Sequence, residues 1–438
     1  MKQHIESVII GAGISGLATG HFLKKRNKEF FIFESNNTVG GVINTQKIKG
    51  LICENGPNTI LINNDAIIEL MDDLDLSREI ISPTKYVKKK FFLHNGKIVE
   101  FPNSIKSFLN TRLISIKSKF KILQRLFFFS KKKYTTVYNY MSDNFGEDFH
   151  NNIIEPFLNG IYAGNTKKMS FRHALPKLWK MNSLYNGFID YFLRKNKKKN
   201  NNNPIYFKEG FSTLINKIKN SLNDEIHTNF KVKKVSKIDQ KKYLIEFSNN
   251  QKITCDNIIF TINPNNIIEI MNLKIKSFDE KLYNPIDVIH FAFNKKDYDR
   301  KIQGFGLLSK QSERTSFLGI LFNSDIFPNV APSELKLITV LVGGENQSNL
   351  CELEKNRICN KVESEIKELL KIKKIVFKKH FRWKYAIPRY NIENIEFLNS
   401  SFNDHLSSYK NIHINGNYLN GVSVSDCISK SKQVAKKI

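Results

Sequence analysis

The sequence predicts an α/β fold of several lobes, and three observations support it. An apolar strand, a glycine-rich turn and a helix follow one another from Val8 onward. A second apolar strand, Phe30–Phe33, ends at an acidic residue, and strands alternate with helices again beyond residue 205. Because 438 residues are too many for one compact core, two or three lobes are expected.

The first lobe opens with a nucleotide-binding pattern. Gly11, Gly13 and Gly16 follow the first strand directly. Their missing side chains allow a tight turn, close approach of the backbone to a pyrophosphate, and a helix N-terminus that favours an anion. Glu34 follows Gly13 at a distance of 34 − 13 = 21 residues. This spacing places a carboxylate against an adenosine ribose and disfavours a 2′-phosphate.

Two further glycine signals extend the pattern. Gly40 and Gly41 follow the acid, and Gly56 stands between Glu54 and Pro57. Nicotinamide dehydrogenases do not need this extension, and an ordinary glycine-rich turn would not repeat it. The sequence therefore predicts a Rossmann-like domain that binds FAD.

Charge and composition narrow the function classes. Lys and Arg number 69 against 41 Asp and Glu, a net charge of +28. Nucleic-acid binding, attraction to an anionic membrane or substrate, and drift toward Lys, Asn, Ile and Phe would each explain it. With no nucleic-acid module visible, drift with some surface electrostatics is favoured and no nucleic-acid partner is expected. Five scattered cysteines and ten scattered histidines predict reduced thiols and no metal site.

Location follows from what the sequence lacks. The first strand begins almost at the N-terminus, and no run of 18 uninterrupted apolar residues occurs. We therefore expect a cytoplasmic protein without a leader or a spanning helix. Peripheral contact with the inner face of the cytoplasmic membrane is left open, as is a homodimer.

A second region is expected to be helical and basic. A helix over 65–76 is followed by a hairpin over 86–101, which turns at Asn95-Gly96. Apolar residues then recur at steps of three and four over 105–129, interleaved with lysine and arginine. This segment suits a membrane surface, or its apolar face packs on the rest of the protein. The polar tract 195–203 predicts an exposed loop at a lobe boundary.

The later chain predicts a return to the first lobe and a substrate lobe. A helix is expected over 212–222, strands over 230–235, 243–247 and 253–260, further strands over 288–293, 317–322 and 337–342, and a helix over 352–370. The predicted division is an FAD-binding domain of 1–82, 205–262 and 408–438, a mixed-sheet substrate-binding domain of 83–102 and 263–407, and an inserted helical lobe of 103–204.

Four later segments carry a resemblance. They are PFLNGIYAGNTKKMS (156–170), the stretch 304–332 with FGLL, GILFNSDIFP and AP, RWKYAIPRY (382–390), and GNYLNGVSVSDCI (416–428). In this order, and over nearly the whole length, the chain resembles the flavin-containing amine oxidoreductases, and within them the enzymes that oxidise protoporphyrinogen. It departs from that pattern at Asn36-Asn37, where a basic residue is usual, at 261–263, which lack a proline, and after Tyr390, where no Gly-His follows.

The resemblance implies a reaction and its partners. A porphyrinogen would lose six electrons in three rounds of hydride transfer to flavin N5, with molecular oxygen as acceptor and peroxide released. The isoalloxazine carries this redox step, and the protein holds the macrocycle against it and excludes water. No side chain is therefore assigned as catalytic.

The resemblance also assigns cofactor contacts residue by residue. The pyrophosphate falls to Gly11, Ala12, Gly13, Ile14, Ser15 and Gly16; the ribose to Glu34 and Ser35; the ribityl chain and flavin edge to Gly40, Gly41, Val42, Gly56, Pro57, Asn58 and Thr59; the adenine to the Val232 backbone; and the flavin pyrimidine end to Val422, Ser423 and Val424. Trp383 is expected against the flavin, with a core tryptophan as the alternative.

Substrate contacts are assigned in the same way. Lys90 would bind a propionate, with a solvated lysine run as the alternative. Gly164 would let the backbone approach the macrocycle, and Leu308 and Phe322 would sandwich pyrroles, although both residue types are more often core. The alternatives are coproporphyrinogen oxidation, which would require more cationic contacts, an amine or polyamine oxidase, and a basic scaffold without enzymatic activity.

Overall fold

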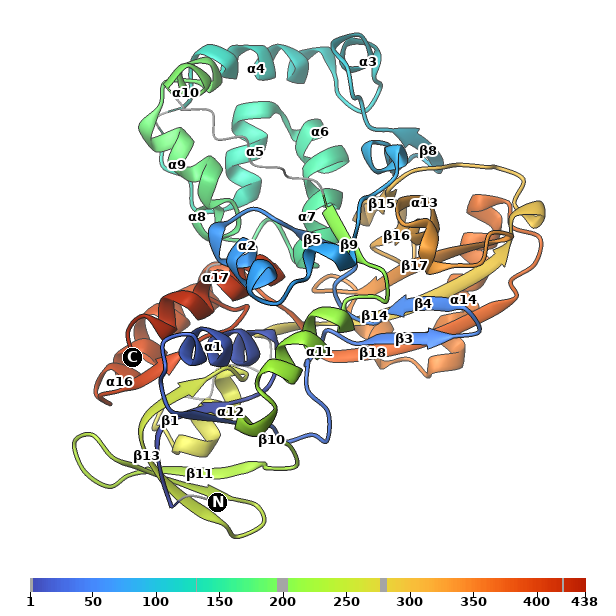
Figure 1. Ribbon diagram of the computed structural model, residues 1–438. Coiled ribbons are helices and arrows are strands. Elements are labelled where there is room, and N and C mark those ends of the chain that lie inside the picture. Colours follow the sequence, from blue (N-terminus) through green and yellow to red (C-terminus); the bar gives the residue numbers. More distant parts are fainter. Residues whose placement is uncertain (1–2, 131, 195–203, 276–281, 420) are drawn as a thin grey trace.

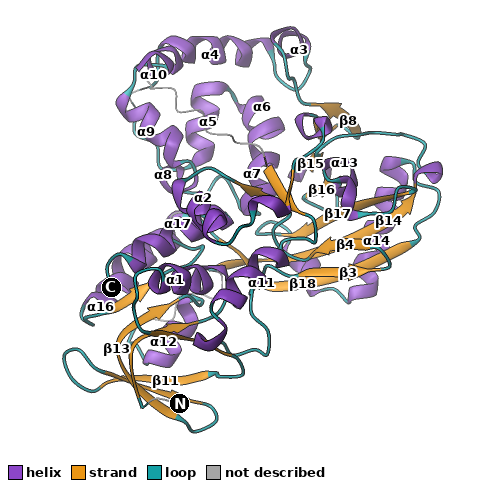
Figure 2. Ribbon diagram, viewed as in Figure 1, coloured by secondary structure: helices purple, strands orange, loops and turns teal. Residues whose placement is uncertain are grey.

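The structure is a computed structural model that describes residues 3–130, 132–194, 204–275, 282–419 and 421–438. Two sheets lie in separate lobes, and a third, helical lobe stands apart from both (Figure 1). Figure 2 shows that strands are concentrated in the first two lobes, whereas the segment from α3 to α10 is helical. The expected tract 195–203 lies outside the described residues.

The first sheet forms the nucleotide lobe. Its described strands are, in spatial order, β10 (Ile226–His227), β2 (Phe30–Phe33), β1 (His4–Ile10), β13 (Lys252–Phe260), β12 (Tyr243–Phe247) and β11 (Val232–Lys237), with β19 (Ile412–Ile414) beside β13. β1, β2, β10, β13 and β19 run parallel, whereas β11 and β12 are antiparallel. β2 and the last three residues of β1, Val8–Ile10, are apolar because both faces of the sheet are covered there.

The second sheet forms the substrate lobe. In spatial order its described strands are β18 (Phe377–Pro388), β14 (Tyr283–Asn294), β17 (Leu335–Gly343), β16 (Gly319–Leu321), β15 (Gly306–Ser309), β7 (Lys90–His94) and β8 (Lys97–Glu100). There are two smaller sheets in the described chain: β3 (Thr45–Ile48) pairs with β4 (Leu51–Glu54), and β9 (Pro204–Phe207) lies between β5 (Ile60–Leu61) and β6 (Ile80–Ile81).

The helices fall into three groups. The nucleotide lobe holds α1 (Ile14–Lys24), α2 (Asp65–Asp73), α11 (Ser212–Ser221), α12 (Pro264–Met271), α15 (Ile392–Phe397), α16 (Asn403–Ser407) and α17 (Val424–Ala435); the helical lobe holds α3 (Ile105–Asn110), α4 (Ile116–Phe127), α5 (Val137–Phe145), α6 (Glu147–Phe149), α7 (Glu155–Tyr162), α8 (Phe171–Ala174), α9 (Pro176–Leu184) and α10 (Phe188–Arg194); and the substrate lobe holds α13 (Asn323–Ile326) and α14 (Lys355–Leu370).

Local chemistry explains where several elements begin and turn. Asn64 caps α2 by accepting from the first-turn N–H groups, and Glu354 caps α14 in the same way. Asn95 and Gly96 both have positive φ, 51° and 70°, as the turn of a two-residue hairpin requires. Ser115 caps α4, which splits the expected helical stretch 105–129 into α3 and α4.

The predicted division into lobes stays a prediction, and the sheets and apolar cores can be set beside it. All strands of the first sheet fall within 1–82, 205–262 and 408–438, and all strands of the second within 83–102 and 263–407. However, apolar residues of α12, of α15 and of the segment 398–406 pack in the core of the nucleotide lobe. These segments were assigned to the substrate lobe because the partition followed strand patterns, which say nothing about where a surface helix docks.

Candidate functional site

The candidate site begins at one edge of the first sheet. β1, β2 and β13 are parallel, so their ends at Ile10, Phe33 and Phe260 lie together. Ligands of open α/β sheets bind outside the carboxyl ends of the strands. The Gly11 N–H donates to the Phe33 carbonyl at 2.8 Å, which fixes the glycine loop at this edge.

The glycines of the loop serve two purposes. A Cβ on Gly16 would lie 1.9 Å from the Gly11 carbonyl oxygen, so α1 packs on the loop only because residue 16 has no side chain. A Cβ on Gly13 would meet nothing within 4 Å, and Gly13 is the N-cap of α1. Gly40 lies beside this turn, with its N–H donating to the Ala12 carbonyl at 2.8 Å. Gly13 therefore leaves open space in front of a helix N-terminus, where a phosphate fits.

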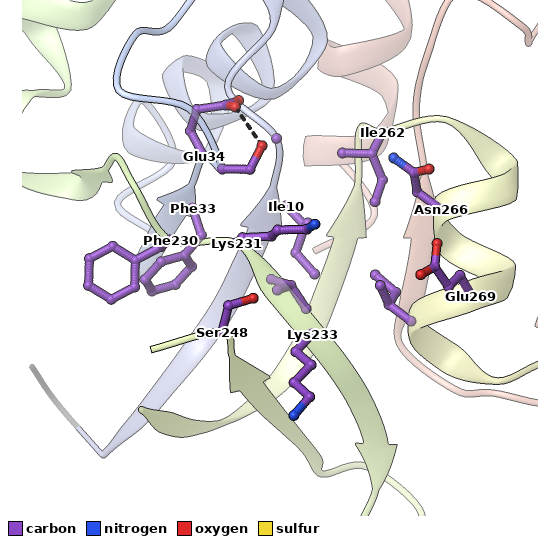
Figure 3. A pocket seen from close by; sticks show the side chains of 14 residues that line it. Ile10, Phe33, Glu34, Phe230, Lys231, Lys233, Ser248, Ile262, Asn266 and Glu269 are labelled. Carbon is purple, nitrogen blue, oxygen red and sulfur yellow. Dashed lines mark hydrogen bonds between the residues drawn. The ribbon is translucent and has the colours of Figure 1, made fainter. Parts of the chain in front are cut away.

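A cavity of about 490 Å³ lies beyond the loop on the β2 side. Figure 3 shows Glu34 at one side of it, Asn266 and Glu269 of α12 at the other, and Lys231 between them. Val232, at the start of β11, also lines the cavity. The Glu34 carboxylate is buried and accepts from the Ala12 N–H at 2.8 Å and the Asn36 N–H at 2.9 Å. Its oxygens are thus held at the cavity wall, as contact with a ribose requires.

A second cavity of about 280 Å³ adjoins the first, because Ile262 and Asn266 line both. Its walls also include residues from the glycine turns, from β18 and from the loop before α17; they are Gly13, Ile14, Ser15, Gly40, Gly41, Val42, Pro57, Tyr283, Tyr385, Asn417, Tyr418, Val422, Val424 and Cys427. No Asp, Glu, Lys or Arg is among the described residues that line it. Burial raises the pKa of the Cys427 thiol to about 11, so this wall is neutral as well.

The N-terminus of α17 closes the second cavity. Ser423 and Asp426 cap each other's backbone N–H groups, which fixes the first turn. The N–H groups of Val424 and Ser425 have no acceptor within the helix. They offer donors beside a neutral cavity, where a flavin carbonyl gains negative charge on reduction.

The residues present fit FAD. The first cavity offers a fixed carboxylate, the open space at Gly13 lies between the two cavities, and the second cavity is uncharged, as a neutral isoalloxazine requires. The structure therefore brings together, around two adjoining cavities, Gly11, Gly13, Ile14, Ser15, Glu34, Ser35, Gly40, Gly41, Val42, Pro57, Val232, Val422 and Val424.

Other predicted cofactor residues lie behind this wall. Ala12 and Gly16 belong to the glycine loop, but neither lines a described cavity. Asn58, Thr59 and Ser423, in other segments, do not line one either. Gly56 packs directly against the Val42 carbonyl, where a Cβ would come within 1.9 Å. Its role in this geometry is to seat Val42.

Trp383 contacts the chain segment that leads to Gly56. Its Nε1 donates to the Asn55 carbonyl at 2.6 Å, and its ring packs in an apolar cluster with Phe381. It does not line either described cavity. Trp383 thus holds the chain segment that precedes Gly56, and its contact with the flavin stays a prediction.

The predicted substrate residues are more scattered. Lys90 is exposed, with its Nζ 6.0 Å from the centre of the Phe305 ring. Gly164 is buried against Met169 and Glu345, and Leu308 is half-buried and packs against apolar residues of the helical lobe. Phe322 is 1% exposed in the substrate-lobe core, with Lys336 Nζ 5.0 Å from its ring centre, which argues against a pyrrole contact.

Two buried carboxylates near the site are structural. Burial raises the pKa of Glu54, whose oxygens accept from Tyr206 Oη at 2.6 Å and from the Phe211 N–H at 2.9 Å. Burial alone would raise the pKa of Asp287, but hydrogen bonds from Arg382 and His380 lower it overall. Arg382 binds both Asp287 oxygens at 2.7 Å, so the arginine of the RW motif fixes β18 against β14.

Sequence reasoning missed one wall of the site. Thr261, Ile262 and Asn263 follow β13, and Asn266 lies on α12. All four line the second cavity, and Ile262 and Asn266 also line the first. The signal was available, because β13 is parallel to β1 and its end must lie at the ligand edge. Tyr283 and Tyr385 had no such signal, since their position depends on how the second sheet packs on the first.

Comparison with known proteins defines the class. The fold is that of FAD-binding oxidoreductases, and the family model described as flavin containing amine oxidoreductase matches residues 14–438. The chain belongs to this family, and FAD is its cofactor.

The relatives found include porphyrinogen oxidases. The chain is 26% identical to protoporphyrinogen oxidase 2 of Arabidopsis thaliana, over 98% of this chain and 92% of that protein. It is 24% identical to coproporphyrinogen III oxidase of Bacillus subtilis strain 168, over 98% and 97%. A crystal structure from Exiguobacterium sp. 255-15, provisionally named a protoporphyrinogen oxidase, has a TM-score of 0.84 at 17% identity and covers 100% of this chain and 98% of that one. At this identity, the similarity to the Exiguobacterium structure shows a common fold and nothing about function.

Proposed function

We propose that this protein oxidises protoporphyrinogen IX to protoporphyrin IX in heme biosynthesis. Six electrons and six protons leave the substrate in three turnovers, and three molecules of oxygen become three of hydrogen peroxide. The observation that carries the proposal is the uncharged second cavity, which adjoins the nucleotide cavity and would hold a flavin ring against a large apolar substrate. The full-length relatives named as porphyrinogen oxidases support it.

The chain's own residues would bind and orient. FAD, when bound, supplies a two-electron acceptor. The α1 N-terminus at Gly13 would hold its phosphates, Glu34 its ribose, and the α17 N-terminus its pyrimidine carbonyl. Lys90 would bind a substrate carboxylate from the rim. No side-chain base is required of the cavity wall, which offers only hydroxyl, amide and thiol groups.

The same wall disfavours an amine substrate. A protonated amine beside a flavin in the second cavity would meet no carboxylate among the described residues that line this cavity, so its charge would be desolvated without compensation. An amine or polyamine oxidase is therefore the weaker alternative. Coproporphyrinogen III is the closer one, because the Bacillus subtilis relative carries that name at similar identity.

The test compares the two porphyrinogens directly. Purified FAD-loaded protein is mixed in air with each substrate, and porphyrin fluorescence is followed against protein-free autoxidation. We expect kcat/KM for protoporphyrinogen to exceed that for coproporphyrinogen by about tenfold, a difference of about 1.4 kcal/mol in transition-state binding. A preference for coproporphyrinogen would overturn the substrate, and no enzymatic rate with either would overturn the function.

A further inference from the structure

The first cavity differs from the second in its charge. Four charged side chains line it, whereas the described residues that line the second cavity include none; the four are Glu34, Lys231, Lys233 and Glu269. FAD is the cofactor of this family, and it must bring an anionic diphosphate to the glycine loop at the edge of this cavity. The balance among these four side chains therefore bears on how tightly FAD is held.

The two carboxylates oppose an anionic ligand. Glu34 is buried and fixed by the Ala12 N–H, and Glu269 stands on α12 at the facing wall (Figure 3). Like charges in one cavity repel, and the repulsion is stronger near protein than in bulk water. The N-terminus of α1 at Gly13 offers only about half a positive charge. A diphosphate between two carboxylates thus needs a further cation.

The segments that form the phosphate site do not supply this cation. Residues 8–23, which contain the glycine loop and most of α1, include no Lys or Arg, and neither do residues 35–46, which follow Glu34. Lys233 lines the first cavity, but Figure 3 shows its side chain directed away from Glu34. Among the described lining residues, Lys231 is therefore the cation placed to act on a ligand at the loop.

Lys231 is held in a suitable position. The Ser248 N–H donates to its carbonyl at 2.9 Å, which fixes the backbone at the start of β11. Figure 3 shows its side chain extending across the cavity toward Ile10, the residue before the glycine loop, between Glu34 and Glu269. No ion pair or side-chain hydrogen bond joins its ammonium to another described residue. This ammonium is thus a cation without a protein partner inside a ligand cavity.

We propose that Lys231 supplies the counter-charge for the FAD diphosphate and that Glu269 opposes it from the facing helix, so that these two side chains set the affinity for the cofactor. Lysine suits this role because it is a point charge on a long flexible stem, and the stem can cover an apolar wall while the ammonium follows the phosphates. The proposal concerns the cofactor alone. It goes beyond the proposed function and does not depend on which substrate is oxidised.

Flavin titration of the full chain tests it. Protein freed of flavin is titrated with FAD in about 0.15 M salt, where charges farther apart than about 8 Å are largely screened, and flavin fluorescence gives Kd. We expect Lys231→Gln to raise Kd by about tenfold, as for one charged contact, and Lys231→Arg to stay within about threefold of the parent. Glu269→Gln should lower Kd by about threefold, because a like charge is removed.

The matched control is Lys234→Gln. It removes the same charge from the same strand, but Lys234 is exposed and does not line the cavity, so Kd should stay within about twofold of the parent. The melting temperatures of the flavin-free proteins should be equal, since these side chains belong to no core. An equal loss of affinity in Lys234→Gln and Lys231→Gln would overturn the proposal in favour of general surface charge.

Competition by fragments of the cofactor identifies the group that Lys231 contacts. ADP and adenosine are each used to displace FAD from the parent protein and from Lys231→Gln. The inhibition constant of ADP should rise by about tenfold in the variant, and that of adenosine by less than about twofold, because adenosine has no phosphate. Equal losses for both would place the ammonium on the adenine ring, and no loss for either would remove Lys231 from the site; each result would overturn the proposal.

Discussion

At Gly13 the backbone is ordinary, with φ −72° and ψ 179°, so any residue could adopt it. What a side chain would remove there is space for a ligand, since a Cβ meets no protein atom within 4 Å. We predict that Gly13→Val folds with a melting temperature, measured without FAD, close to that of the parent apoprotein, but purifies with little or no FAD. The ratio of flavin to protein absorbance and a thermal melt measure both quantities.

Gly16→Ala is the matched control with the opposite pattern. Its Cβ would lie 1.9 Å from the Gly11 carbonyl, so we expect loss of folded protein as well as of flavin. If Gly13→Val instead retained a full complement of FAD, the glycine turn would not be the phosphate site.

Lys90 is exposed at the start of β7 and free to reach a substrate carboxylate. We predict that Lys90→Ala raises KM for the porphyrinogen by about tenfold, or about 1.4 kcal/mol, and changes kcat little, because one partly exposed charged contact is lost. Lys88→Ala, two residues earlier and also exposed, should leave KM unchanged. An equal effect of both substitutions would point to general electrostatics, and no effect of either would remove Lys90 from the site.

Single residues were predicted best where the backbone itself makes the contact. Gly13 was placed by spacing along the chain, and Gly40 and Val422 by the family resemblance; all three line the second cavity. Phe322 and Trp383 line neither described cavity, because the direction of their side chains depends on strand register and on how the second sheet packs on the first. Lys231 shows the same limit: its strand was expected, but its position across the first cavity was not.

At the scale of elements, β18 depends on a buried ion pair. Asp287 is fully buried on β14, and Arg382 of β18 binds both of its oxygens. We predict that Asp287→Asn lowers the free energy of unfolding by about 3 kcal/mol, since it leaves Arg382 without a counter-charge. Asp299→Asn, in an exposed pair with Lys373, should cost less than about 1 kcal/mol. Chemical denaturation compares them, and equal losses would contradict the prediction.

The same pair predicts a pH dependence. The pKa of Asp287 is lower in the folded protein than its ordinary value, so its stabilising effect is fully present above the unfolded pKa of about 3.9 and is lost as pH falls through the folded value. We expect the difference in melting temperature between the parent and Asp287→Asn to shrink on acidification below about pH 4. A difference that grows with acid would reverse the sign and contradict the pKa direction.

Strong local patterns predicted the elements well. The strands β2 and β12 begin and end at the expected residues, and the hairpin turns at Asn95-Gly96 as expected. The break between α3 and α4 was missed, because the apolar spacing continues through a segment where Ser115 begins a new helix. The orientation of α4 could not be predicted either, since Lys119 and Lys121 donate to backbone carbonyls outside this helix, and the apolar spacing does not indicate such contacts.

At the scale of the whole molecule, the cofactor cavities join distant parts of the chain. Gly13, Asn266, Tyr385 and Val422 belong to widely separated segments and line one space. We predict that FAD at one hundred times its Kd raises the free energy of unfolding of the apoprotein by about 2.7 kcal/mol. A thermal melt with increasing FAD measures this, and Gly13→Val should show little shift; a large shift in that variant would place the binding elsewhere.

One contact has a consequence for how the molecule is made. Asn415 and Ser431 bind each other at 2.8 Å, and Ser431 Oγ also donates to the Ser15 carbonyl at 2.9 Å, so α17 is fastened to the first helix of the chain. During translation the glycine turn emerges some four hundred residues before this partner. A nascent chain on the ribosome thus has the glycine turn but not α17, and FAD can be held by the complete site only after α17 has been synthesised.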